Sequence, residues 1–318
     1  MKKLSTVFTL ALALLGGALI FSGELRAQEP ALAAEAEKLA PAFIPGKIYT
    51  YQNQTTVTMK LPAPEGKTIE RQVVMAQQAK LVTAPRTGEA GVAIDASTER
   101  MQFTVKSPDR EMKYDSEDEA SKQTKLGQHF EGSRRRSLSL ELDDTPKIVH
   151  TEEKGGGGPA TPMPGMPQFG PDELRQLVHG LLQGFPPDPV KPGSEWTQKG
   201  KRPIGQFGDT EFEITYRYTG DETVDGAECA IIEFSGQMKG DVSVSGPQPG
   251  TEGGKLGFES KGLQGRLVFD KLRRAVRESS QTVTMTVDVP SQDRLSNRKL
   301  RLPIRQETSV KLVSLQDA

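Results

Sequence analysis

The chain has 318 residues, and its 41 Lys and Arg nearly balance its 42 Asp and Glu, for a net charge of −1. This balance gives no support for a nucleic acid or another polyanion as a partner. The single cysteine, Cys229, excludes an intramolecular disulfide, and the 32 glycines and 22 prolines favour a turn-rich β protein over a helical bundle.

The first 27 residues have the layout of a secretory leader. Lys2 and Lys3 precede an uncharged apolar run, Val7–Phe21, and small and polar residues follow up to Ala27. The run has about 15 residues, fewer than the roughly 20 that a membrane-spanning helix needs. We therefore predict a signal peptide at 1–27 and an extracytoplasmic mature protein, periplasmic or secreted, with no transmembrane segment. A retained membrane anchor is the alternative.

Residues 28–150 predict an N-terminal β half. An Ala- and Glu-rich stretch at 30–40 predicts a short helix that ends before Pro41. After it, apolar and polar residues alternate with the period of a strand that has one buried face. This pattern recurs at Tyr49–Tyr51, Val57–Leu61, Val73–Val82, Val92–Ile94, Met101–Val105, Glu111–Tyr114 and Leu138–Leu142.

Residues 151–170 interrupt the strands with a run of glycines followed by several prolines, a composition typical of a linker. A helix is then predicted from Pro171, because proline suits the first helical position, and Gly184 and Pro186 end it. Its apolar face consists of Leu174, Leu177, Val178, Leu181, Leu182 and Phe185. We expect this face to pack in the core, and it is also the candidate face for an apolar ligand or a partner.

The alternation of apolar and polar residues resumes after Pro192. We therefore predict that residues 171–318 form the helix and a C-terminal β half. Strands are expected at Phe212–Tyr218, Cys229–Phe234, Leu267–Phe269, Val283–Val289, Leu300–Ile304 and Val310–Leu312. Residues 240–262 hold many Gly and Ser and predict a long excursion between strands. The expected fold class is mainly β: antiparallel curved sheet or sheets made of two β halves, with one amphipathic helix after a Gly/Pro-rich linker.

The two β halves share an order of short signals. A Pro-Gly pair followed by an aromatic residue occurs at Pro45–Tyr49 and again at Pro192–Trp196. An aromatic residue followed by Asp ends a strand at Tyr114–Asp115 and at Phe269–Asp270. Because the spacings between these signals differ, two interpretations stay open: the halves arose by duplication, or they are unrelated. A duplication predicts two similar β layers or two halves of one curved sheet.

Three of these elements resemble a bacterial family of secreted proteins that carries the domain of unknown function 6263. They are Tyr114–Ser116, Lys191–Trp196 and Leu267–Asp270. The resemblance covers most of the chain after the leader, although the glycine run and the proline-rich linker depart from the family pattern. It implies no activity and supplies no catalytic residue.

No set of residues predicts a reaction or a bound ion. His129, His150 and His179 lack the spacing of metal ligands. The acidic cluster at 115–119 offers oxygen ligands for calcium but lacks the central glycine of an EF-hand loop, which favours a solvated turn. We therefore name no catalytic, metal-binding or cofactor-binding residue and expect no cofactor.

Basic residues gather at 134–136, 271–277 and 298–305. They allow contact with an anionic glycan or a membrane surface, but charged solvent faces that discourage edge-to-edge aggregation are favoured.

Three hypotheses about function follow. The favoured one is a non-enzymatic binding or envelope-associated module, whose concave sheet face holds an acyl chain or another apolar ligand under the helix at 171–185. The helix is then a lid or a plug, and a lipid or envelope component is the partner. The alternatives are a hydrolase that uses scattered carboxylates and an interaction protein of a cell-surface assembly.

Overall fold

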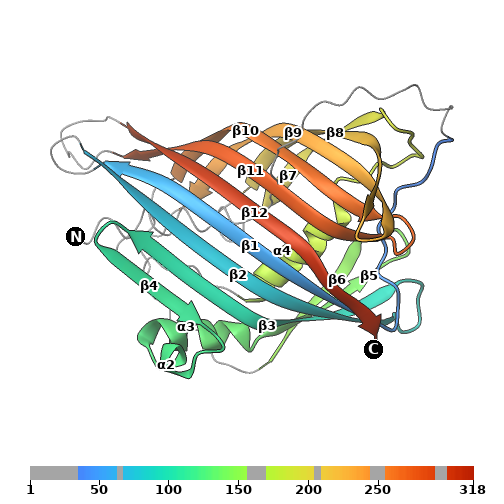
Figure 1. Cartoon of the computed structure of the whole chain (residues 1–318), viewed down its shortest axis with the longest axis horizontal. Helices are drawn as coiled ribbons and strands as arrows, with labels where there is room; N and C mark the ends of the chain where they lie inside the picture. Colours follow the sequence, from blue (N-terminus) through green and yellow to red (C-terminus); the bar gives the residue numbers. More distant parts are fainter. Residues whose placement is uncertain (1–34, 63–66, 156–169, 204–208, 244–254, 291–298) are drawn as a thin grey trace.

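A computed structural model describes residues 35–62, 67–155, 170–203, 209–243, 255–290 and 299–318, so the predicted leader lies outside the described residues. Within them, 12 strands form one antiparallel sheet in the order β6-β5-β3-β2-β1-β12-β11-β10-β9-β8-β7, with β4 paired to β3 (Figure 1). The strands are β1 (Lys47–Pro62), β2 (Thr68–Pro85), β3 (Val92–Ser107), β4 (Arg110–Asp115), β5 (Ser137–Leu142), β6 (Ile148–Lys154), β7 (Glu195–Pro203), β8 (Asp209–Val224), β9 (Ala227–Ser243), β10 (Lys255–Asp270), β11 (Ala275–Pro290) and β12 (Lys299–Asp317). The helices are α2 (Glu119–Lys122), α3 (Lys125–Arg134) and α4 (Pro171–Leu182). The prediction of a mainly β fold with an antiparallel sheet is confirmed.

The two halves of the chain join in one sheet because the first strand pairs with the last. The register of β1 against β12 runs from Lys47 opposite Asp317 to Met59 opposite Ile304. The N-terminal half then continues outward from this centre to β6, whereas the C-terminal half enters at the edge strand β7 and returns to the centre. Strand pairing is therefore continuous from one half to the other.

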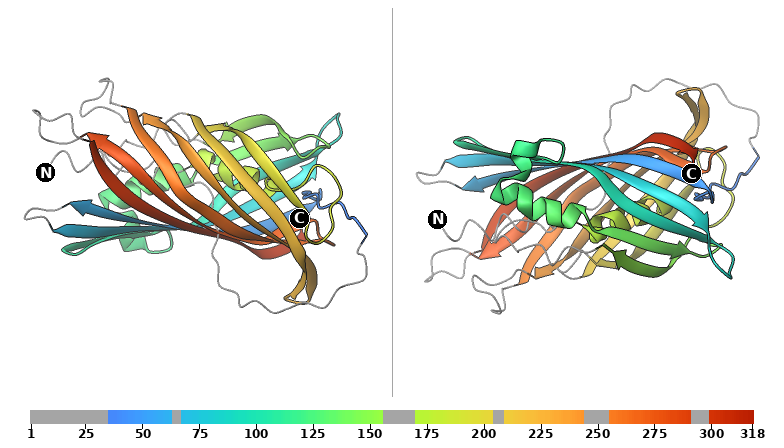
Figure 2. Two further views of the ribbon diagram at one scale, coloured as in Figure 1. Left: turned by 90° about the horizontal axis from the view of Figure 1, so that it is seen from above. Right: turned by 90° about the horizontal axis from the view of Figure 1, so that it is seen from below.

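The sheet bends around two of its helices. In Figure 2 the N-terminal wing (β1–β6) and the C-terminal wing (β7–β12) enclose α3 and α4, whereas α2 lies at the outer side of the N-terminal wing. Helix α3 packs Phe130 against Phe103 of β3 and Tyr114 of β4, with ring centroids 4.9 and 5.0 Å apart. Helix α4 contacts β3 and β5 of the N-terminal wing, and the chain just beyond it reaches the other wing, where Phe185 packs on Phe269 of β10.

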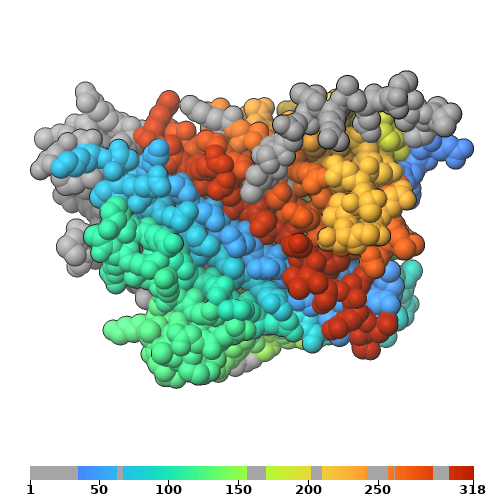
Figure 3. Space-filling model, viewed as in Figure 1, coloured from blue at the N-terminus to red at the C-terminus, as the bar shows by residue number. Residues whose placement is uncertain are grey.

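Alternate residues of the central strands fill the interior. Along β1, Tyr49, Tyr51 and Val57 are buried, whereas Gln52 and Gln54 are exposed. The buried set faces the helices and the exposed set faces solvent, as the period of two requires. Figure 3 shows the outer face, which β1, β2 and β12 cross diagonally.

The predicted linker begins too early. Residues 151–154 belong to β6, which pairs with β5, whereas 156–169 lie outside the described residues. As an edge strand, β6 buries almost nothing, so it lacks the alternation of apolar residues by which the other strands are recognised.

The predicted excursion at 240–262 and the predicted helix at 30–40 are wrong over the residues that the structure describes. Strand β9 runs to Ser243 and β10 starts at Lys255, because glycines in a strand do not prevent backbone pairing. Residues 35–40 are not helical. Glu37 instead forms a bridge with Val190, with both N–H···O distances at 2.8 Å.

The repeated signals occupy equivalent places in the two wings. Gly46 (φ +77°) precedes β1 and donates its N–H to the carbonyl of Thr83 in β2 at 2.9 Å. Gly193 (φ +91°) precedes β7 and donates to the carbonyl of Tyr218 in β8 at 2.7 Å. The series β1 to β4 and the series β7 to β10 each end on an aromatic residue followed by Asp. The shared signals therefore mark two halves of one sheet rather than two layers.

Close strand packing makes a specific glycine of β9 necessary. A Cβ on Gly236 would lie 2.3 Å from the carbonyl oxygen of Glu213 and 2.8 Å from the Cα of Ile214. We expect Gly236→Ala to lower the free energy of unfolding by about 1–3 kcal/mol, because backbone atoms must move. Gly262 of β10 is the matched control, since a Cβ there meets nothing within 4 Å. Urea unfolding followed by circular dichroism measures both, and equal losses would contradict this account.

Candidate functional site

Helix α4 starts with a cap made by its own third residue. The N–H of Gly170 donates to Oε2 of Glu173 at 2.5 Å, and Pro171 occupies the first helical position. Burial raises the pKa of Glu173 to about 7, although the N–H of Gly170 and the charge of Arg136 oppose this rise. The predicted helix is confirmed, with its last residue at Leu182.

The apolar face of α4 lies in the core. Leu174, Leu177, Val178, Leu181 and Phe185 are buried, and Leu182 is half-buried against the same cluster. Past the helix the chain turns at Gly184 (φ +85°), which lies against the ring of Tyr216. The predicted core packing is confirmed, whereas contact of this face with a ligand or a partner stays a prediction.

Little free space adjoins this face at its C-terminal end. The cavity that Leu181 and Leu182 share with Tyr49, Tyr51 and Val276 has a volume of about 10 Å³. That is about the volume that one water molecule needs. In this conformation α4 therefore occupies the part of the interior that it faces.

Uncharged polar side chains cross the middle of the concave face. We call them the polar belt: Thr98 (β3), Gln77 (β2), Asn53 and Thr55 (β1), Gln306 and Thr308 (β12), and Gln281 (β11). Two hydrogen bonds join neighbouring strands within the belt. Nε2 of Gln77 donates to Oγ1 of Thr98 at 2.6 Å, and Oγ1 of Thr55 donates to Oγ1 of Thr308 at 2.8 Å.

The polar belt divides the concave face into two apolar regions. On one side lie Tyr49 and Tyr51, which line the small cavity with α4. On the other side lie Val57 and Met59, which are also buried. The belt is therefore a polar boundary between two apolar regions of the concave face.

Several belt atoms have no hydrogen-bond partner in the part of the chain that the structure describes. These atoms are both amide atoms of Gln306, Oε1 of Gln77 and Oδ1 of Asn53. Gln306 is only 1% exposed and Gln77 only 3%. Buried amide atoms are nearly always paired in proteins, so these orphaned atoms are exceptions.

A groove of about 600 Å³ lies on the outer face, between α2 and the strands β1 to β4. Its lining is Gln54, Val74, Ala76, Gln102, Thr104, Lys113, Tyr114, Asp115, Asp118, Ala120, Ser121 and Thr124. Asp115 accepts hydrogen bonds from Gln102 at 2.6 Å and Arg100 at 3.1 Å. Although burial opposes the shift, the N–H of Glu117 and these side chains lower the pKa of Asp115.

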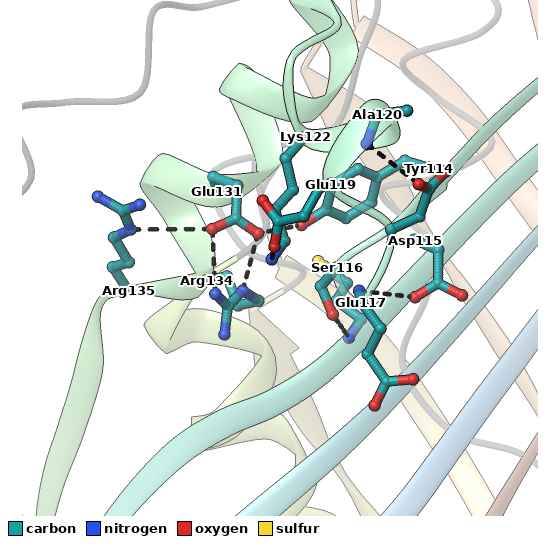
Figure 4. Close-up of polar contacts among 12 residues, drawn as sticks. Tyr114, Asp115, Ser116, Glu117, Glu119, Ala120, Lys122, Glu131, Arg134 and Arg135 are labelled. Atoms are coloured by element: carbon teal, nitrogen blue, oxygen red, sulfur yellow. Dashed lines mark hydrogen bonds and ion pairs between the residues drawn. The ribbon is translucent and has the colours of Figure 1, made fainter.

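A buried polar contact anchors α3 to β4 beside this groove (Figure 4). The hydroxyl of Tyr114 donates to Oε1 of Glu131 at 2.7 Å, and Arg134 donates to both oxygens of Glu131 at 3.0 Å. Burial and the bond to Glu131 raise the pKa of Tyr114. Both carboxylate oxygens of Glu131 are therefore engaged within the protein.

Contacts within the protein account for the acidic cluster at 115–119. Besides the contacts of Asp115, Glu117 pairs with Arg100 at 2.9 Å and Glu119 pairs with Lys122 at 2.6 Å. Asp118 caps α2 by accepting the N–H of Ala120 at 3.0 Å. Among the described residues, no group of three or more His, Cys, Asp or Glu is placed to hold a metal ion.

The basic run at 271–277 binds acidic groups of the same chain. Nζ of Lys271 lies 2.6 Å from Glu228, 2.7 Å from Asp221 and 3.1 Å from Glu37. Although burial opposes the shift, these carboxylates raise the pKa of Lys271. Tyr218 donates to Glu37 at 2.6 Å, so this network ties the N-terminal segment to β8, to β9 and to the turn that follows β10.

The other two basic runs also have acidic partners. Arg134 and Arg135 pair with Glu131, and Arg136 pairs with Glu153. In the third run Arg301 lies 3.6 Å from Asp288 and Arg305 lies 2.6 Å from Glu307, while 298–300 lie outside the residues whose side chains are described. These pairs fit the favoured interpretation, charged faces on the protein surface.

Three histidines and the cysteine complete the predicted candidates. His129 is buried on α3 with its ring 5.3 Å from that of Phe130, whereas His150 of β6 and His179 of α4 are exposed. Cys229 is buried, and burial raises the pKa of its thiol, with a further contribution from Asp270.

Neither a scan against models of protein families nor a search of curated proteins finds a match. Among solved structures, the chain is similar to lipovitellin, in a structure of its lipid–protein interactions, with 10% identity and a TM-score of 0.44. That similarity covers 87% of this chain but only 26% of the lipovitellin chain.

Two further solved structures are similar over most of both chains. DynF from the dynemicin biosynthesis pathway of Micromonospora chersina is 8% identical with a TM-score of 0.21, over 93% of this chain and 95% of DynF. A DUF1329 family protein from Desulfovibrio piger is 8% identical with a TM-score of 0.14, over 84% and 85%. Likenesses at these scores carry no argument about function. Within the described part of the chain, no helix has the length and apolar character needed to cross a bilayer.

The raised pKa of Glu173 makes the stability of the chain depend on pH. Because this pKa is about 7 in the folded chain against 4.5 for an ordinary glutamate carboxyl, the folded state retains a proton that the unfolded state releases. Stability from this residue is therefore greatest below pH 4.5 and is lost as the pH rises through about 7. Glu173→Gln keeps an acceptor for the N–H of Gly170 and should become more stable relative to the wild type over that interval.

Urea unfolding at several pH values between 4 and 8 measures this difference, with Glu152→Gln on the exposed face of β6 as the control. Parallel stability curves for the wild type and Glu173→Gln would show that the pKa of Glu173 is not raised.

Proposed function

We propose that this protein is a non-enzymatic, extracytoplasmic binding module of the cell envelope, which holds an apolar ligand such as an acyl chain between its curved sheet and α4. The observation that carries the proposal is the position of α4, an amphipathic helix laid across the concave apolar face between two wings of one sheet. The leader predicted at 1–27 supports the compartment. We also propose membership of the secreted family with the domain of unknown function 6263.

Helix α4 is an interior element that can move without breaking the sheet. The sheet is held by strand pairing from β6 to β7, and α4 takes no part in it. At the helix ends, Glu173 donates its N–H to the carbonyl of Gly170, and Gln183 donates to Gly180, so these backbone bonds stay local. Side-chain packing is therefore the main contact of α4 with the wings.

An acyl chain can compete with this packing. Burying an apolar side chain contributes about 1.5–3 kcal/mol, so the five buried residues of the apolar face contribute about 8–15 kcal/mol. Each CH₂ group of a ligand contributes about 0.8 kcal/mol, so a chain of 12 to 16 carbons contributes about 10–13 kcal/mol. The two terms are of the same size, which allows a ligand to displace a plug.

The alternative functions have less support. The buried carboxylates of Glu131 and Asp270 are each bonded to arginines of the same chain, which gives a hydrolase with scattered carboxylates no support from them. A docking protein would use the apolar face of α4, but that face is buried against the wings. The binding module uses the concave face once a ligand displaces α4 from it.

If α4 competes with the ligand for the interior, weaker packing of α4 should lower the stability of the protein and raise its affinity for the ligand. Leu181→Ala should lower the free energy of unfolding by about 2–4 kcal/mol, since Leu181 is 4% exposed. It should also tighten binding of the apolar fluorophore N-phenyl-1-naphthylamine by about threefold or more, because the competing helix packs less well. Fluorescence titration and urea unfolding measure the two effects.

Ile231→Ala in β9 is the matched control, because Ile231 is 2% exposed but packs with Cys229 and Val268 in a cluster separate from the one that holds α4. It should lose comparable stability without tighter binding. A wild-type chain that binds no fluorophore, or a Leu181→Ala variant that binds it more weakly, would argue against the proposal.

Protein purified from its native envelope, with the leader present at expression, should carry an acyl-chain compound. Solvent extraction followed by mass spectrometry detects it at close to one equivalent. A preparation that contains no apolar compound, and takes up none when mixed with envelope lipids, would contradict the binding function.

A further inference from the structure

We infer that the polar belt recognises an uncharged polar group, an ester, amide or hydroxyl, of an amphipathic ligand whose hydrocarbon part lies along the concave face. The ligand class is a neutral lipid such as an acylglycerol. This inference rests on the proposed function and adds the chemistry of the ligand to it.

The first argument is the hydrogen-bonding capacity left open in the belt. Both amide atoms of Gln306, Oε1 of Gln77 and Oδ1 of Asn53 are buried atoms without partners in the described part of the chain. Burying an amide without a hydrogen-bond partner costs free energy. A ligand that supplies the missing hydrogen bond removes this cost. The belt therefore offers acceptor oxygens and a donor NH₂ that favour a ligand with hydroxyl and carbonyl groups.

The second argument is the arrangement of these groups. In the register of β1 with β12, Thr55 lies opposite Thr308, and Gln306 lies opposite Val57. In the register of β1 with β2, Asn53 lies opposite Gln77. The bonded Thr55–Thr308 pair thus lies between two places that have unpaired polar atoms. One place holds Asn53 and Gln77, and the other, further along the strands, holds Gln306. The apolar regions on either side fit hydrocarbon.

The third argument is charge. All seven belt residues are uncharged, so the belt has no cation to pair with a carboxylate or a phosphate. Burying an anion without a partner is strongly unfavourable. The nearby Arg134 is already bonded to both oxygens of Glu131. The belt therefore favours a neutral lipid over a fatty-acid anion or an anionic phospholipid.

Competition for bound N-phenyl-1-naphthylamine tests this selectivity. At pH 8, 1-monopalmitoylglycerol should displace the fluorophore from the full chain at about tenfold lower concentration than palmitate, which carries the same hydrocarbon and a charge. Gln306→Leu and Gln77→Leu should each reduce this preference by threefold or more, once each displacement concentration is corrected for the affinity of that variant for the fluorophore.

Gln52→Leu on the outer face of β1 is the matched control and should leave the preference unchanged. Gln306→Leu should also unfold at a higher urea concentration than the wild type without ligand, because it removes an unpaired buried amide. That result shows that a loss of preference does not come from misfolding.

The outcomes separate the two proposals. Binding of the fluorophore with equal displacement by both lipids, or with a preference that both Gln variants retain, overturns the inference and leaves the binding function standing. If neither the fluorophore nor the monoacylglycerol binds, the proposed function fails and the inference fails with it.

Discussion

The pairing of β1 with β12 is the interaction on which the rest of the structure depends. It joins the first described strand to the last over a register that extends from Lys47–Asp317 to Met59–Ile304. Without it, each wing would expose a long central edge, and such edges favour association with other chains. With it, a single sheet is long enough to bend back on itself and to create an interior that neither wing encloses alone.

A sheet that bends around an interior needs something to fill it, and the chain uses two different solutions. On one side of the polar belt, α4 supplies aliphatic side chains down to a residual cavity of about 10 Å³ beside Tyr49 and Tyr51. In the N-terminal wing, α3 supplies Phe130 and fixes itself to β4 through Tyr114 and Glu131. The contact of α3 uses buried hydrogen bonds to a charged residue and is directional, whereas that of α4 is mainly apolar.

The sequence allowed prediction of those elements whose buried face is apolar. Helix α4 was predictable because its leucines repeat at helical spacing between Pro171 and Gly184. Helix α3 was missed because its buried residues include Gly127, His129 and Glu131, so that no apolar stripe marks it, although Thr124 is a recognisable N-cap. The polar belt was missed for another reason: its residues come from five strands, and only the register brings them together.

In the binding function that we propose, the polar belt also makes the contacts of a ligand differ in free energy from those of α4. The apolar face of α4 can match a hydrocarbon chain in buried area, but it carries no group that bonds to Gln306 or Gln77. A ligand with one polar group near its hydrocarbon chain can match this buried area and also form hydrogen bonds with these glutamines. Because only differential contacts shift an equilibrium between two states, the unpaired amides supply the difference that area alone does not. Burying these amides costs stability in the free chain, and the same cost becomes selectivity when a ligand of the right chemistry enters.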